Sequence, residues 1–263
     1  MSPILQRLLV RYGAFGPNHR GKARGLDMAS RVFGTTRIRL ANGIDLPLRM
    51  NSSMDLSYVR AAREKPSLVA SLLDRLRPGD CYVDVGANVG YYTVQASKRV
   101  GPEGVVVAVE PSTREFVRLL QSISWNDCAN VISVRAALGN RSGIIRLDVE
   151  SSHTGLNHIS EHGREIVPLF RGDALLPELI GDRRTFIKID VEGAEPLVME
   201  GMRGVLARPM TQAVVAEMTP SFSAAMGLDI EAAHDLMQGL GYTVRGTEGS
   251  GAGTDTWFER STG

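Results

Sequence analysis

Short apolar runs alternate with amphipathic segments through the central part of the chain. Five runs have the length of a strand, and helical or loop segments separate them: Tyr82 to Val85, Val105 to Val109, Val131 to Val134, Phe186 to Ile189 and Ala213 to Ala216. Continuous apolar runs are typical of strands that are buried on both faces of a parallel sheet. Because the runs alternate with helices, the pattern predicts a doubly wound α/β fold with a mostly parallel sheet.

Apolar stripes and end signals predict the helices of this fold. A helix from Ser67 to Leu76 would stop at Pro78-Gly79, and another would run from the glycine turn at Gly90 through Val100. A third, from Thr113 to Ile123, has an apolar stripe that we expect to be buried, formed by Phe116, Val117, Leu119, Leu120 and Ile123. Ser112, with Glu115 three residues later, has the spacing of a capping box at the start of that helix.

The C-terminal part predicts one helix and two strands. Ile230 to Leu240 has helical spacing, and Tyr242 to Arg245 and Thr256 to Glu259 can pair antiparallel across a glycine-rich loop. No linker divides this region from the apolar runs before it. We therefore expect residues 67–260 to form one domain.

Residues 1–66 predict an extension ahead of that domain. Pro3 to Arg11 suggests a basic amphipathic helix, with an apolar stripe formed by Ile4, Leu5, Leu8, Leu9 and Tyr12. This stripe would pack on the domain or on a second subunit, and the alternative is that the helix lies on an anionic membrane surface. Thr36 to Leu48 alternates around Asn42-Gly43 and predicts a β-hairpin. The extension would cover the active site or form a homodimer contact.

Composition excludes several classes of protein. The 263 residues carry 30 basic and 29 acidic side chains, and this balance argues against a nucleic-acid binder that works by bulk charge. Cys81 and Cys128 are too few and too far apart for a disulfide framework or a thiolate zinc site, so a reducing cytoplasm is the expected compartment. No run of 18 apolar residues and no secretory signal are present, so no transmembrane segment is predicted.

A glycine turn after the first apolar run indicates a cofactor pocket. Gly86 and Gly90 would let the backbone approach a ligand closely between a strand and a helix. Asn88 stands where a dinucleotide fingerprint needs glycine, and no Gly-Lys-Ser/Thr ending follows, so pyrophosphate binding is disfavoured. Glu110 ends the next strand, where a carboxylate can accept hydrogen bonds from both hydroxyls of a ribose. A ribose without a diphosphate points to S-adenosyl-L-methionine.

Three segments resemble the FkbM-type methyltransferases: Asp84 to Tyr91, Val109-Glu110-Pro111, and above all Ile187 to Glu195, with the order Lys-Ile-Asp-Val-Glu-Gly-Ala-Glu. The resemblance implies a class I S-adenosylmethionine-dependent methyltransferase with seven strands, the last of them antiparallel. Such enzymes act most often on a hydroxyl of a sugar, polyketide or other natural product.

The resemblance also assigns residues to the cofactor. Gly86, Asn88 and Gly90 would line the methionine end, Glu110 would hold the ribose, and Ala136 and Ala137 would border the adenine. The other motif residues expected in the same pocket are Asp84, Ala87, Tyr91, Pro111 and Asp190.

Methyl transfer to an alcohol also requires removal of a proton, and carboxylates at strand ends are the first candidates for the base. Asp190 ends the fourth predicted strand and Glu217 the fifth, so both would lie at the carboxyl edge where open α/β sheets bind ligands. His153 is the second candidate base, in a polar segment that also holds His158 and His162. Magnesium held by Asp190 and Glu217 remains open as another way to lower the pKa of the acceptor.

Two further acidic residues follow Asp190. Glu192 and Glu195 could satisfy the N-terminus of the helix that begins there, or could act at the site. The predicted function is an S-adenosylmethionine-dependent O-methyltransferase for a sugar, glycan or natural-product hydroxyl. The alternatives are an N-methyltransferase of a small molecule or peptide, and a protein that binds S-adenosylmethionine without catalysis.

Overall fold

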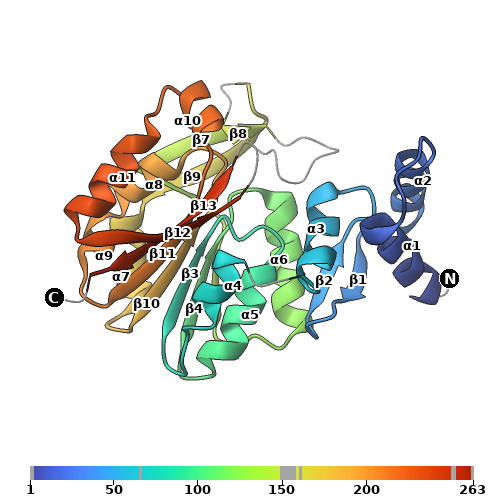
Figure 1. The fold of residues 1–263 in the computed structure, drawn as a ribbon, viewed down its shortest axis with the longest axis horizontal. Coiled ribbons are helices and arrows are strands. Elements are labelled where there is room, and N and C mark those ends of the chain that lie inside the picture. The colour runs from blue at the N-terminus through green and yellow to red at the C-terminus, as the bar shows by residue number, and fades with distance from the viewer. Residues whose placement is uncertain (1–2, 65–66, 149–157, 160–161, 250–252, 262–263) are drawn as a thin grey trace.

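The computed structural model describes residues 3–64, 67–148, 158–159, 162–249 and 253–261. Its centre is a seven-stranded sheet with the strand order β12-β13-β11-β10-β3-β4-β5 (Figure 1). The strands are β3 (Cys81–Val85), β4 (Val105–Val109), β5 (Val131–Val134), β10 (Thr185–Ile189), β11 (Thr211–Met218), β12 (Tyr242–Glu248) and β13 (Thr254–Arg260). β13 pairs antiparallel with both of its neighbours, and the pairs from β11 to β5 are parallel. The predicted fold class is confirmed.

Helices cover both faces of this sheet. One face packs against α4 (Leu68–Leu73), α5 (Tyr91–Val100) and α6 (Thr113–Trp125). The other face packs against α7 (Gly172–Ile180), α8 (Glu195–Gly201), α9 (Arg203–Ala207) and α11 (Ile230–Gly239). Every residue of β3 and β10 is buried, which explains why both strands are mostly apolar; the exceptions include Asp84 and Lys188, which pair with each other.

The predicted buried face of α6 was partly wrong. Val117 and Leu120 are 49% and 42% exposed, whereas the buried residues include Glu115 and Arg118. The helix turns this charged side inward because Arg118 forms ion pairs with Asp55 and Glu115.

The predicted capping box at the start of α6 is also absent. The Ser112 side chain makes no cap hydrogen bond, the Ser112 N–H donates to Glu110, and the Glu115 carboxylate accepts from Arg114 and Arg118. The Ser112 N–H and the Glu115 carboxylate are therefore both engaged by other partners.

The N-terminal extension contains more structure than the sequence predicted. It comprises α1 (Pro3–Phe15), α2 (Lys22–Phe33), the strands β1 (Thr36–Arg39) and β2 (Asp45–Leu48), and α3 (Ser53–Ala61). β1 and β2 pair antiparallel, so the hairpin is confirmed, but α2 and α3 were missed. The hairpin and these helices pack against α5 and α6 and share one apolar core with them.

Of the predicted apolar stripe of α1, Leu9 packs against the shared core, whereas the other four residues are exposed. Val10 and Ala14 form the buried side of α1, while Leu5 and Leu8 of the stripe are 45% and 58% exposed. The stripe faces outward because α3 and α2 contact the opposite side of the helix, near Gly13.

A second sheet was not predicted. It has the order β6-β9-β7-β8, from β6 (Ala137–Gly139), β7 (Gly143–Asp148), β8 (His158–Ile159) and β9 (Glu165–Arg171). Only one of its faces is apolar and buried, through Ile145, Leu147, Val167 and Leu169. β7 has polar residues among its apolar ones, and Pro168 interrupts the apolar run of β9, so neither strand carried a clear signal in the sequence.

The cysteines and the lengths of the helices bear on disulfide bonds and on membrane spans. Cys81 and Cys128 are both free and buried, so they form no disulfide. None of the described helices combines the length and the apolar character that a membrane span requires.

Candidate functional site

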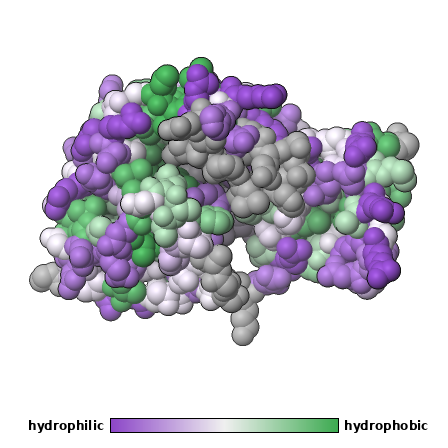
Figure 2. All heavy atoms as spheres, turned by 90° about the horizontal axis from the view of Figure 1, so that it is seen from above, coloured by the Kyte–Doolittle hydropathy of each residue, from purple (hydrophilic) through white to green (hydrophobic). Residues whose placement is uncertain are grey.

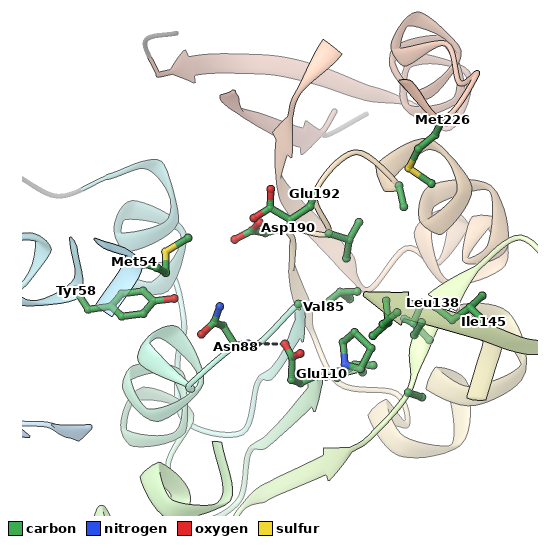
Figure 3. A pocket seen from close by; sticks show the side chains of 18 residues that line it. Met54, Tyr58, Val85, Asn88, Glu110, Leu138, Ile145, Asp190, Glu192 and Met226 are labelled. Atoms are coloured by element: carbon green, nitrogen blue, oxygen red, sulfur yellow. Dashed lines mark hydrogen bonds between the residues drawn. The ribbon is translucent and has the colours of Figure 1, made fainter. Parts of the chain in front are cut away.

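A cavity lies at the carboxyl ends of β3, β4 and β10 (Figure 3). The turn after β3 contributes Gly86 and Asn88, the end of β4 contributes Glu110, and the end of β10 contributes Asp190. This is the edge where parallel α/β sheets bind ligands, because loops diverge there from adjacent strands.

The glycine turn is held in its shape by close contacts. Gly86 has a φ of 78°, and a Cβ at this position would lie 1.8 Å from the backbone oxygen of Asp190. Asn88 also has positive φ, at 51°, and its backbone N–H donates to Glu110 Oε2 over 2.8 Å. The turn after β3 is therefore fixed by both neighbouring strands, β4 and β10.

Glu110 connects the turn to the end of β4. Its Oε1 accepts from the Ser112 N–H over 2.9 Å, and its Oε2 accepts from Asn88. Burial raises the pKa of Glu110 to about 8, although both hydrogen bonds act to lower it. Each carboxylate oxygen keeps a further lone pair, and the residue lines the cavity, so it can still accept from a ligand hydroxyl.

The predicted cofactor residues fall into two groups. Those that line the cavity are Gly86, Asn88, Glu110, Pro111, Ala136, Ala137 and Asp190. Asp84, Ala87, Gly90 and Tyr91 do not line it. Asp84 is fully buried and accepts from the Thr93 hydroxyl over 2.6 Å, while the Tyr91 ring stacks on Tyr58. These four residues support the turn from behind, and a Cβ on Gly90 would lie 2.7 Å from Leu119 of α6.

Three carboxylates gather beside the cavity. Asp190, Glu192 and Glu217 each offer an oxygen within 4.8 Å of the others, so they could hold a divalent cation. Asp190 and Glu192 line the cavity, and Glu217 lies next to Asp190. Asp190 and Glu217 are therefore brought together as predicted, with Glu217 behind the lining.

The acidic environment raises the pKa of several of these groups. Burial raises the pKa of Glu217 to about 9, with a further contribution from Asp190, and raises that of Glu192 to about 8. Asp255, which faces Glu217 across the β11–β13 pair, has its pKa raised to about 6, again chiefly by burial. Burial and the neighbouring negative charges thus favour the protonated form of Glu217.

Lys188 is a site residue that sequence reasoning missed. Its ammonium is buried, 3.1 Å from Asp190 Oδ2 and 3.5 Å from Asp84 Oδ1, and it donates to the Gly86 carbonyl over 3.1 Å. It therefore joins the glycine turn to the acidic cluster. A lysine inside an otherwise apolar strand was the signal that could have revealed it, because a buried ammonium needs charged partners.

Glu192 and Glu195 have different roles. The Glu195 carboxylate accepts from the N–H groups of Val191 and Gly193, so it holds the loop ahead of α8. Glu192 has a φ of 56° and lines the cavity, so it belongs to the site (Figure 3).

Other lining residues come from elements that the sequence did not predict. Met54 and Tyr58 reach the cavity from α3, Ile145 and Leu147 from β7, and Met226 from the end of α10 (Pro220–Ala225). Their contribution depends on long-range packing, which periodicity along the chain does not report.

The second candidate base was His153, in the segment that also holds His158 and His162. His153 lies outside the described residues, as does most of its segment. His158 forms part of β8, and His162 is exposed. Neither described residue is among those that line the cavity.

Residues 84–244 match the model of the methyltransferase FkbM domain. The chain belongs to this family. The match begins at Asp84, ahead of the glycine turn, and extends into β12, so the FkbM domain contains the whole cofactor side of the cavity. α1, α2, the hairpin and α3 lie ahead of it.

Two similar proteins carry names that refer to methyl transfer. The hexuronic acid methyltransferase AglP of Haloferax volcanii is 28% identical over 158 residues, which are 60% of this chain and 64% of that protein. The match thus covers less than two thirds of that relative. A Clostridium thermocellum structure named for rRNA methylation has a TM-score of 0.50 at 9% identity, covering 75% of this chain and 99% of its own. That likeness shows the fold alone.

Proposed function

We propose that this FkbM domain is an S-adenosylmethionine-dependent O-methyltransferase whose acceptor is a hydroxyl of a sugar or glycan. The observation that carries the proposal is that Asp190, a partly exposed carboxylate, lines the same cavity as Gly86, Asn88 and Glu110. A proton acceptor thus lies beside a turn that suits a nucleoside. The hexuronic acid methyltransferase relative supports a sugar as the acceptor.

The cavity residues fit S-adenosylmethionine in their chemistry. Glu110 keeps lone pairs for the ribose hydroxyls, and Gly86 and Asn88 provide a tight turn without bulky side chains at the methionine end. Ala136 and Ala137 are small enough to border an adenine ring. When bound, the cofactor supplies an electrophilic methyl group on its sulfonium.

Asp190 would take the proton of the acceptor hydroxyl. An unperturbed alcohol is a weak nucleophile at neutral pH, so a positioned base accelerates its attack. The Lys188 ammonium pairs with Asp190, which fixes the orientation of the carboxylate. The Asp190 side chain is 32% exposed, so it remains accessible from the cavity.

A divalent cation is the second way to activate the acceptor. Asp190, Glu192 and Glu217 would hold it, and magnesium suits their oxygen ligands. The cation would lower the pKa of the bound hydroxyl and would replace the base.

The proposal is tested by transfer of a labelled methyl group from S-adenosylmethionine to sugars, uronic acids and amines, with and without a chelator. We expect O-methylated sugar in chelator-treated enzyme if Asp190 is the base. Loss of activity with chelator and recovery with magnesium would favour the cation. A methylated amine would indicate N-methyl transfer. Binding of S-adenosylhomocysteine without any transfer would indicate a non-catalytic protein, and absence of binding would contradict the cofactor assignment.

A further inference from the structure

The side of α1 that faces away from the molecule is apolar. Five large apolar side chains on α1 are at least 36% exposed: Ile4, Leu5, Leu8, Tyr12 and Phe15. Their spacing places them on one side of the helix, opposite the buried Val10 and Ala14. An amphipathic helix normally turns its apolar stripe toward the core, so this orientation calls for an apolar environment outside the chain.

α2 repeats the arrangement. Its buried residues are Leu26 and Ser30, whereas Met28 and Val32, four residues apart, are 69% and 66% exposed. These are among the most exposed large apolar side chains of the described residues. Two neighbouring helices therefore both present apolar side chains outward.

Basic residues accompany these apolar side chains. Residues 1–34 contain six basic and one acidic side chain, a net charge of +5, so the remainder of the chain carries −4. Arg7, Arg11 and Arg24 are exposed and form no ion pair with any residue that the structure describes. In Figure 2 the end of the molecule that holds α1 and α2 shows hydrophobic and strongly hydrophilic residues side by side.

We propose that the outward faces of α1 and α2 bind the surface of an anionic lipid bilayer. Apolar side chains would enter the boundary between headgroups and acyl chains, and the arginines would contact the anionic headgroups. A second copy of the chain fits the same faces less well. A twofold interface would place Arg7, Arg11 and Arg24 against the same positively charged surface of the second copy. Asp27 is the one acidic residue among residues 1–34 that could balance this charge.

The test is co-sedimentation of the full chain with phosphatidylglycerol vesicles and with phosphatidylcholine vesicles. We expect binding to the anionic vesicles that weakens as salt is added. Because each basic residue near an anionic surface strengthens binding roughly fivefold, Arg7→Gln with Arg11→Gln should weaken it roughly thirtyfold. Leu5→Gln with Leu8→Gln removes apolar contact, so it should weaken binding to phosphatidylglycerol vesicles and also any weaker binding to phosphatidylcholine vesicles.

Matched controls make the same changes elsewhere. Val117→Gln with Leu120→Gln alters two exposed apolar residues of α6, and Arg77→Gln with Arg203→Gln alters two exposed arginines. Binding should stay within about twofold of the parent for both controls. Titration with S-adenosylhomocysteine should give the same affinity for all variants, because none of these residues lines the cavity.

Three results would overturn the proposal. These are no vesicle binding, equal binding by the α1 variants and their controls, or a stable dimer that the Leu5→Gln and Leu8→Gln changes dissociate in the absence of lipid.

Discussion

At the scale of single residues, Asp190 is distinguished by its surroundings. The Lys188 ammonium lies 3.1 Å from one of its oxygens, and Glu217 and Glu192 surround it with further carboxyl groups. Asp190 lines the cavity whereas Glu217 does not, so the two residues are unequal although both lie at the end of a strand. This inequality favours Asp190 over Glu217 as the base.

Asp190→Asn tests that assignment. The substitution nearly preserves shape but removes the proton acceptor, so turnover should fall about 10²–10⁴-fold. Affinity for S-adenosylhomocysteine should change little, and the measurement is turnover beside calorimetric titration. Asp182→Asn, at a fully exposed aspartate, is the control. His153→Ala belongs in the same assay as the test of the second candidate base. If both variants kept parental turnover in the presence of a chelator, neither residue would be the base.

Glu110→Ala tests the cofactor assignment. The variant removes the acceptor for ribose hydroxyls and leaves the N–H groups of Asn88 and Ser112 without theirs. Leaving buried donors without their acceptor costs about 1–3 kcal/mol, so S-adenosylhomocysteine should bind roughly five- to a hundredfold more weakly. Calorimetric titration measures this, with Glu103→Ala, at an exposed position, as the control. An affinity within about twofold of the parent in a folded variant would place the ribose elsewhere.

At the scale of elements, the sequence predicted the strands of the central sheet from their apolar runs. The bounds of β4 agree with its run, and those of β3 and β10 differ by one residue, because strands that are buried on both faces need mostly apolar side chains. The bounds of β5 agree as well, although this edge strand is only partly buried. β7 and α3 were missed although both reach the cavity. β7 is buried on one face only, and α3 buries Asp55, which reads as a surface residue until Arg118 is known to face it.

The prediction of site residues was limited in the same way, because it used only local sequence patterns and the expected fold. Residues on the glycine turn and at strand ends were found because their position follows from the fold. Tyr58, Met54 and Ile145 were not, since nothing local marks them as cavity residues.

Arg118 joins α6 to the N-terminal extension, and its removal tests how firmly the two are connected. The guanidinium is buried, donates to the Pro47 carbonyl, and forms ion pairs with Asp55 and Glu115. Arg118→Met leaves Asp55 buried without its counter-charge, so the free energy of unfolding should fall by about 3–5 kcal/mol. Urea denaturation measures the change.

A double variant separates the lost ion pair from a general packing defect. Asp55→Leu with Arg118→Met should recover part of the loss, because Glu115 still accepts from Arg114. A loss below about 1 kcal/mol for Arg118→Met alone would mean that the pair behaves like a surface contact.

At the scale of the whole molecule, the raised pKa values make stability depend on pH. Glu110, Glu192 and Glu217 have pKa values of about 8, about 8 and about 9, against an ordinary value of 4.5. At pH values between the ordinary pKa of 4.5 and these raised pKa values, the folded chain holds more protons than the unfolded chain. The free energy of unfolding should therefore decrease as pH rises. Urea denaturation between about pH 5 and about pH 9 should show this decrease.

Glu217→Gln should make the dependence shallower, because the amide stays neutral throughout. A parent protein whose stability rose over the same interval would contradict the assigned protonation states.

The shared core of the N-terminal extension also has a consequence for the order in which the chain folds during synthesis. Ile44, Leu46 and Leu48 of the hairpin are buried together with Val94 of α5 and with Cys128. Ribosomes release the N-terminal part first, so these hairpin residues must wait for the later segments before they can leave water. We expect a protease to cut residues 36–48 in nascent chains that end before Trp125, and to spare them once β5 has emerged.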